Sequence, residues 1–64
     1  MDPKLANYLL AEFDKLRAEQ SDFLNAGRAA DFAEYRHLCG VIRGLTRAES
    51  IVKDLVQRME QSDE

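Results

Sequence analysis

The side chains of this chain that could do chemistry are few, and most of them lie in its second half. Glu34 and His37 have the Glu-x-x-His spacing with which helices of di-iron carboxylate bundles present two ligands from one face. A metal site built on this motif needs further carboxylates, for which Glu12, Glu19 and Asp22 are candidates. A ferritin-like metal-binding hairpin is therefore one alternative, although Glu34 can equally serve as a helix-capping residue.

Catalytic chemistry finds little support in the sequence. Cys39 is the only cysteine, and neither a basic cluster nor a pair of histidines accompanies it to lower the pKa of its thiol. There is no glycine-rich phosphate loop and no strand pattern. We therefore expect that the protein is not an enzyme and has no cofactor. Our primary expectation is also that it binds no metal.

A row of arginines gives the second alternative, a nucleic-acid-binding hairpin. Four of them fall on the outward side of the predicted second helix, where they could follow phosphates: Arg36, Arg43, Arg47 and Arg58. Residues 28–58 carry six basic and four acidic groups, whereas residues 1–25 carry three and five, and the net charge is −3. Phe13, Phe23 and Phe32 are expected to pack in the core and at the turn, not to stack on bases.

The elements that must position these residues are helices. Asp2 can cap a first helix that has Pro3 at its first position, where the missing N–H costs nothing. An apolar stripe then recurs at spacings of three, four and seven: Leu5, Leu9, Phe13, Leu16 and Phe23, widened by Tyr8 and Leu24. Gly27 suits the left-handed position that ends a helix. The pattern predicts a helix over about 3–25 and a turn over 26–30.

A second helix is predicted over about 31–61. Asp31 can cap it, with Glu34 three residues later completing an acidic variant of the capping box. Its apolar residues form a heptad-like row of Leu38, Ile42, Leu45, Val52, Val56 and Met59, beside a row of Val41, Ala48 and Leu55 spaced by seven. Residues 62–64 are expected to fray. The whole chain, 1–64, is thus predicted to be one all-α domain, an antiparallel two-helix hairpin with a long second helix.

Two glycines four residues apart interrupt the second helix, each at a cost of roughly 1 kcal/mol relative to alanine. Gly40, Gly44 and Ala48 could form a ridge of small residues on which another helix packs closely. Alternatively, the helix ends at Gly44, and Thr46 with Glu49 caps a third helix. Too few residues separate Gly44 from Thr46 for a reversal, and the apolar face stays in phase, so a continuous helix is favoured.

The short chain predicts association. Cores of chains below about 70–80 residues usually need a disulfide, a metal or oligomerisation, and a lone cysteine excludes an internal disulfide. If Asn25 lies opposite Asp31, Leu5 lies near Ile51, and the second helix overhangs the first by roughly 15 Å. The predicted interface consists of Gly40, Gly44, Leu45, Ala48, Val52, Leu55, Val56 and Met59. Val56 and Met59 are expected to project from the overhang, uncovered by their own chain.

The expected partners are further copies in a dimer or larger helical bundle, including coiled-coil packing, and a larger protein as a second option. No apolar run approaches the roughly 20 residues of a membrane span, and the start of the chain lacks a signal-peptide pattern. A lone thiol fits a reducing cytoplasm, or a virion assembled there. The expected function is a non-catalytic protein–protein interaction or assembly module.

One stretch also resembles a group of known proteins. It runs Tyr35-x-x-Leu38-Cys39-Gly40-x-Ile42-x-Gly44-Leu45-x-x-Ala48, followed by Ile51, Asp54-Leu55 and Arg58-x-Glu60. It looks like small helical-hairpin proteins of tailed bacteriophages, and the resemblance covers roughly the second half of the chain. It implies a phage accessory or virion-associated protein, in the host cytoplasm or the virion, and transfers no active site.

In size and outline the chain is also similar to Rop-type plasmid regulators. These are antiparallel hairpins that pair into four-helix bundles and bind RNA. They bind it through residues of their first helix, whereas the basic row lies on the second helix here. This departure puts an RNA function in doubt.

Overall fold

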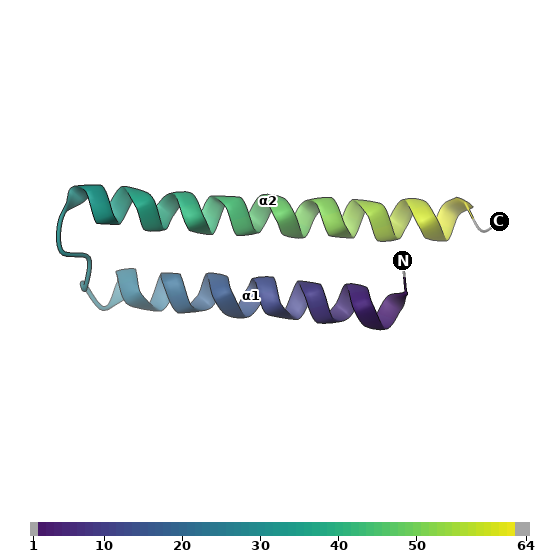
Figure 1. Ribbon diagram of the computed structural model, residues 1–64, viewed down its shortest axis with the longest axis horizontal. Coiled ribbons are helices and arrows are strands. Elements are labelled where there is room, and N and C mark those ends of the chain that lie inside the picture. Colours follow the sequence, from purple (N-terminus) through teal and green to yellow (C-terminus); the bar gives the residue numbers. More distant parts are fainter. Residues whose placement is uncertain (1, 63–64) are drawn as a thin grey trace.

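Two long antiparallel helices make up the protein. A computed structural model describes residues 2–62, with α1 at Pro3–Asn25 and α2 at Phe32–Ser62. The helices lie side by side in a single layer, 51 × 17 × 12 Å between Cα extremes (Figure 1). The predicted all-α hairpin is therefore confirmed. Ser62, expected in the frayed tail, belongs to α2, and the rest of that tail, 63–64, lies outside the described residues.

The start of α1 follows its local sequence. The Asp2 carboxylate Oδ1 accepts a hydrogen bond from the Lys4 N–H at 3.0 Å, and the Asp2 carbonyl accepts one from the Ala6 N–H at 3.0 Å. Pro3 occupies the first helical turn, where it lacks only a donor that would have had no partner in the helix. The predicted cap and the predicted first residue are both confirmed.

The end of α1 depends on Gly27, whose φ of +70° lies in the left-handed region. Its N–H donates to the Leu24 carbonyl at 3.0 Å, and the Arg28 N–H donates to the Phe23 carbonyl at 3.3 Å. This pair of bonds is the Schellman arrangement, which satisfies carbonyls left over at a helix end. The predicted stop at Gly27 is confirmed.

Asp31 caps α2, which begins at Phe32, one residue after the expected start. The Asp31 Oδ1 accepts from the Glu34 N–H at 2.8 Å, which is the first half of the predicted capping box. α2 then runs unbroken through Gly40 and Gly44. The three-helix alternative is wrong, because Thr46 does not cap a helix: its hydroxyl donates to the Ile42 carbonyl at 3.0 Å, one turn back within α2.

The register between the helices differs from the expected one. Pairing Asn25 with Asp31 would set Arg17 near Cys39, yet the Arg17 guanidinium donates to Thr46 Oγ1 at 3.4 Å. Leu5 and Ile51, expected to be neighbours, are 51% and 68% exposed. The reason lies in the connection, because α2 begins beyond the end of α1 and the first turn of α2 has no part of α1 beside it (Figure 1).

This shift also shortens the expected overhang. The start of α1 lies beside the last few turns of α2, which extends only a short way past it (Figure 1). Val56, predicted to project uncovered, is half-buried, and Met59 is 40% exposed. The expectation of a long uncovered end was therefore wrong for Val56.

Replacing Gly27 tests the hairpin's turn. A Gly27→Ala substitution should lower the free energy of unfolding by about 1 kcal/mol, because a side chain disfavours the left-handed conformation. Urea unfolding followed by circular dichroism at 222 nm measures the change. Ala26→Gly, at the neighbouring right-handed position, is the control for a general effect of composition at the turn. An unchanged midpoint in Gly27→Ala would contradict the role of the turn.

Candidate interaction surface

Burial in this hairpin is confined to one seam and is incomplete there. Ala6, at 2% exposure, is the only buried residue in the described part of the chain. The remaining apolar residues of the seam are half-buried: Leu9, Leu10, Phe13 and Leu24 of α1, and Leu38, Ile42, Leu45, Val52 and Val56 of α2. Leu45, Val52 and Val56, predicted as interface residues, therefore contribute to the contact with α1 in their own chain.

A charged network crosses the middle of the seam. Arg17 Nη1 lies 2.8 Å from Glu49 Oε2 and forms an ion pair with it. The hydrogen bond of this Nη1 goes to Thr46 Oγ1 and not to Glu49 Oε2. Arg17 Nη2 lies 2.7 Å from Asp14 Oδ1, and Lys53 Nζ donates to Glu49 Oε1 at 2.8 Å. The Arg17 and Glu49 side chains are only 25% and 16% exposed. A cation and an anion thus meet where the neighbouring turns place apolar side chains.

The network shifts the ionisation of both central groups. The hydrogen bond from Lys53 lowers the pKa of Glu49, with the Arg17 charge acting in the same direction against the effect of burial. The hydrogen bond to Asp14 raises the pKa of Arg17, with the Glu49 charge helping and burial opposing. Each group therefore stabilises the charged form of the other.

The same contacts fix which flanks of the two helices share a side. Arg17 reaches Thr46, so the flanks with these residues lie together and form a polar side. Because the two helices are antiparallel, their opposite flanks must then lie together as well. Side chains seven apart repeat on one face of a helix, so the residues of each flank can be read from their spacing. These flanks carry Leu5, Leu9, Leu16 and Phe23 of α1, and Val41, Ala48, Leu55 and Met59 of α2. We call these eight residues the apolar side.

The apolar side is partly open in the single hairpin. Leu16, Leu55 and Met59 are each 40–42% exposed, and Leu5 is 51% exposed. The other four residues are half-buried. Large apolar side chains gathered on one face of a soluble hairpin are typical of an interaction site. Of the predicted interface, Ala48, Leu55 and Met59 belong to this side.

The predicted glycine ridge does not pack on α1. A Cβ placed on Gly40 or Gly44 would have no neighbouring atom within 4 Å, apart from the helix's own backbone. Gly44 lies on the flank that includes Ala48, and Gly40 lies further out at the edge. Nothing within the hairpin therefore requires glycine at either position.

The residues of the metal alternative are not gathered into a site. Glu34 contributes its N–H to the Asp31 cap, and His37 is exposed on α2. Among residues 2–62, no three His, Cys, Asp or Glu side chains come together as a group that could hold a metal ion. Cys39 is half-buried, and its hydrogen bond with Tyr35 raises the pKa of the Tyr35 phenol.

The four arginines of the nucleic-acid alternative are all exposed on α2, as expected. Arg36 lies over the ring of Phe32, 5.9 Å from its centre, and Phe32 stacks against Tyr35 with 6.3 Å between ring centres. Phe32, expected to pack in the core or at the turn, is 71% exposed and contacts only neighbours on α2 among the contacts described above. It precedes the first paired turn of α2, where no part of α1 can cover it.

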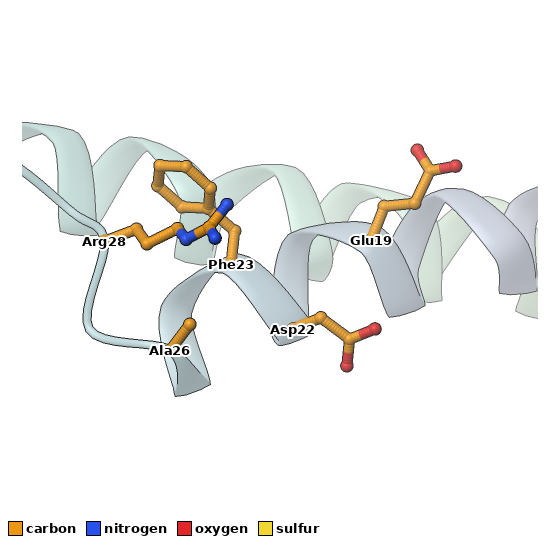
Figure 2. A pocket seen from close by; sticks show the side chains of 5 residues that line it. All are labelled: Glu19, Asp22, Phe23, Ala26 and Arg28. Carbon is orange, nitrogen blue, oxygen red and sulfur yellow. The ribbon is translucent and has the colours of Figure 1, made fainter.

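Two shallow depressions mark the surface. One, at the end of α1, is lined by Glu19, Asp22, Phe23, Ala26 and Arg28. Figure 2 shows the Arg28 side chain reaching across to the ring of Phe23, while both carboxylates point away from that ring. The other is lined by Ile51, Asp54, Leu55 and Arg58, at the edge of the apolar side. Neither combines a nucleophile with a base.

Comparisons of the chain with family models, with curated proteins and with solved structures found no match. Neither helix, over the residues that the structure describes, has the length of apolar sequence that a membrane crossing requires. The predicted interface did not include Arg17 or five residues of the apolar side: Leu5, Leu9, Leu16, Phe23 and Val41. Their heptad positions were readable, but the side on which each lies depends on the register.

Adding a side chain at Gly40 should strengthen the hairpin. Gly40→Ala is expected to raise the free energy of unfolding by about 0.5–1 kcal/mol, because the position is helical and open. Thermal unfolding by circular dichroism measures it. Ser50→Ala, at another exposed position of α2, controls for general helix propensity. A loss of stability in Gly40→Ala would show that the position is occupied by something outside the hairpin.

Acid should weaken the hairpin through Glu49. Its pKa in the folded chain lies below the ordinary value of 4.5, so its contribution is present above pH 4.5 and is lost as the pH falls through the folded pKa. The melting temperature should therefore drop between pH 5 and pH 3. In Glu49→Gln the drop should be smaller, starting from a lower value at pH 7. Equal pH dependence in the two proteins would contradict this role.

Proposed function

We propose that this protein is a non-catalytic protein–protein interaction module that assembles as a homo-oligomer through its apolar side. The observation that carries the proposal is the burial pattern: among residues 2–61, whose burial the structure describes, Ala6 is the single buried residue. A fully buried core residue usually contacts 6–12 others. Two helices in one layer cannot supply these neighbours, and a second layer on the apolar side can.

The energetic gain from such a layer is large relative to the stability of a small domain. Full burial of a leucine or methionine side chain stabilises by about 1.5–3 kcal/mol, and four of these side chains on the apolar side are about half exposed. Domains of this kind have a total stability of only about 5–15 kcal/mol. Covering the apolar side therefore decides how stable the fold is.

The polar side offers no comparable surface. Its centre is filled by the Arg17 network, whose charges already have partners within the hairpin. The outward side of α2 carries the exposed arginines and Asp54. The setting that we propose, a phage accessory or virion-associated protein, rests on the sequence resemblance alone.

Charges on the apolar side should abolish assembly. The double variant Leu16→Lys with Leu55→Lys places two ammonium groups where a second layer would cover them. The unmodified chain should show a mass above the 7.3 kDa of one chain and a melting temperature that rises with concentration. The variant should be a monomer with reduced helicity. Light scattering and circular dichroism measure both properties.

The matched control is Ser50→Lys with Ser21→Lys, which adds the same two charges away from the apolar side. This control should retain the mass of the unmodified chain. If the unmodified chain is a monomer with a concentration-independent melting temperature, or if the Leu16 and Leu55 variant assembles normally, the proposed function is wrong.

A further inference from the structure

We propose that the occupant of the apolar side is one second copy of the chain, packed so that each α1 lies on the α2 of the other copy. This proposal rests on the proposed function and specifies its partner and arrangement. The hairpin's broad face, 51 by 17 Å, has an outline of roughly 900 Å², and a specific interface buries about 800 Å² on each partner. One copy is therefore sufficient to cover it.

Closed pairs of identical chains are related by a two-fold axis. With two layers face to face, that axis lies between them and runs either along the helices or across them. Along the helices, α1 faces α2 of the second copy, and both copies lie at the same level. Across the helices, α1 faces α1 and α2 faces α2. The two arrangements bring different residues together.

With the axis along the helices, the register measured within one hairpin sets the register between the copies. The contacts of Arg17 with Thr46 and with Glu49, three residues further along α2, place four pairs of residues at similar levels. These pairs are Leu5 with Met59, Leu9 with Leu55, Leu16 with Ala48, and Phe23 with Val41. Two copies at the same level then stack these pairs into four layers, each with two residues from each chain.

In two of the four layers, a large side chain of α1 meets a smaller one of α2. Phe23, the bulkiest residue of the apolar side, lies level with Val41 of the second copy, whereas Gly40 lies outside the contact at the edge of α2. Next to Val41, the space around Gly44 is open, with no atom within 4 Å of a Cβ placed there. Leu16 meets the small Ala48. The aromatic ring is thus opposite Val41, next to the open space at Gly44.

The charges at the edges of the face favour the same choice. Glu12 and Glu19 lie on the outer edge of the α1 face, and Arg47 lies on the outer edge of α2. In the arrangement along the helices, these two carboxylates are level with positions on either side of Arg47 of the second copy. Lys15 lies between Glu12 and Glu19 in the sequence, but it is further round α1 and so lies away from this edge. In the arrangement across the helices, the acidic edges face each other, as do the basic edges.

The exposure of Tyr8 also supports the assignment. It is 63% exposed at the outer edge of α1 and is level with the turn that contains Leu55. On the second copy, this level holds the depression lined by Ile51, Asp54, Leu55 and Arg58. Ile51 is itself 68% exposed. Two of the most exposed apolar side chains of the hairpin would thus cover each other, and the Tyr8 hydroxyl would reach the polar rim.

Disulfide cross-linking distinguishes the two arrangements. In a Cys39→Ser background, Leu16→Cys and Ala48→Cys are made in separate chains, one of them carrying a tag that changes its mass. The chains are unfolded, mixed, refolded and oxidised, and folding is checked by circular dichroism. Cross-linking needs Cα atoms within about 7 Å. The proposal expects a disulfide between the two different chains, and at least ten-fold less of it in either chain alone.

Each other outcome has a defined meaning. A disulfide between two Ala48→Cys chains, or between two Leu16→Cys chains, shows the arrangement across the helices, which overturns this proposal and leaves the proposed function standing. An assembly of more than two chains, or a dimer that forms none of these disulfides, also overturns it. If both the unmodified chain and the Cys39→Ser chain are monomers, there is no self-association, and the proposed function is overturned as well.

Discussion

Two helices side by side share only one line of contact, and this geometric limit governs the rest of the molecule. Each helix can turn only part of its circumference toward the other, so a side chain in the seam keeps at least one direction open to water. Ala6 escapes exposure because it is small enough to fit beneath its neighbours. Every larger apolar residue of the described chain is left half-covered or exposed. The hairpin is consequently a single layer, and the proposed assembly would add a second layer to it.

Within that seam, the Arg17 and Glu49 pair has a different role from the apolar contacts. Apolar side chains pack in several registers at similar energy, whereas a partly buried charge is costly to separate from its partner. Sliding α1 along α2 by one turn would separate Arg17 from Glu49 and leave each with only the partner in its own helix, Asp14 or Lys53. The pair therefore defines the register, and through it the two sides of the hairpin. A replacement by two apolar residues could leave stability unchanged and still lose the defined alignment.

Local chemistry made the helix ends predictable from the sequence. Asp2 with Pro3, Gly27 and Asp31 each act within a few residues of themselves, so their hydrogen bonds could be inferred without knowing the fold. The continuity of α2 was also predictable, because the apolar phase across Gly40 and Gly44 is a local property. The register was not, since it depends on the path of six connecting residues and on long side chains that meet across the seam.

The candidate surface was predicted in outline but not in detail. Heptad spacing identified two apolar rows on α2, and their division between the seam and the open face required the contact of Arg17 with Thr46. Without it, the sequence could not say whether the row of Leu45 and Val52 or the row of Leu55 faces α1. Phe32 was misplaced for a related reason: its hydrophobicity suggested packing, but it lies on the first turn of α2, which has no part of α1 beside it. In a two-helix protein, position along the helix matters as much as the face.

The single buried residue also has a consequence for the cell. When a chain is ordered only on meeting its counterpart, folding and assembly become one bimolecular reaction, and the ordered fraction rises with abundance. At low abundance most chains are open to proteases, which remove the unpaired ones. Production above a threshold then yields a stable population. In the proposed assembly, the hairpin would thereby report on its own supply.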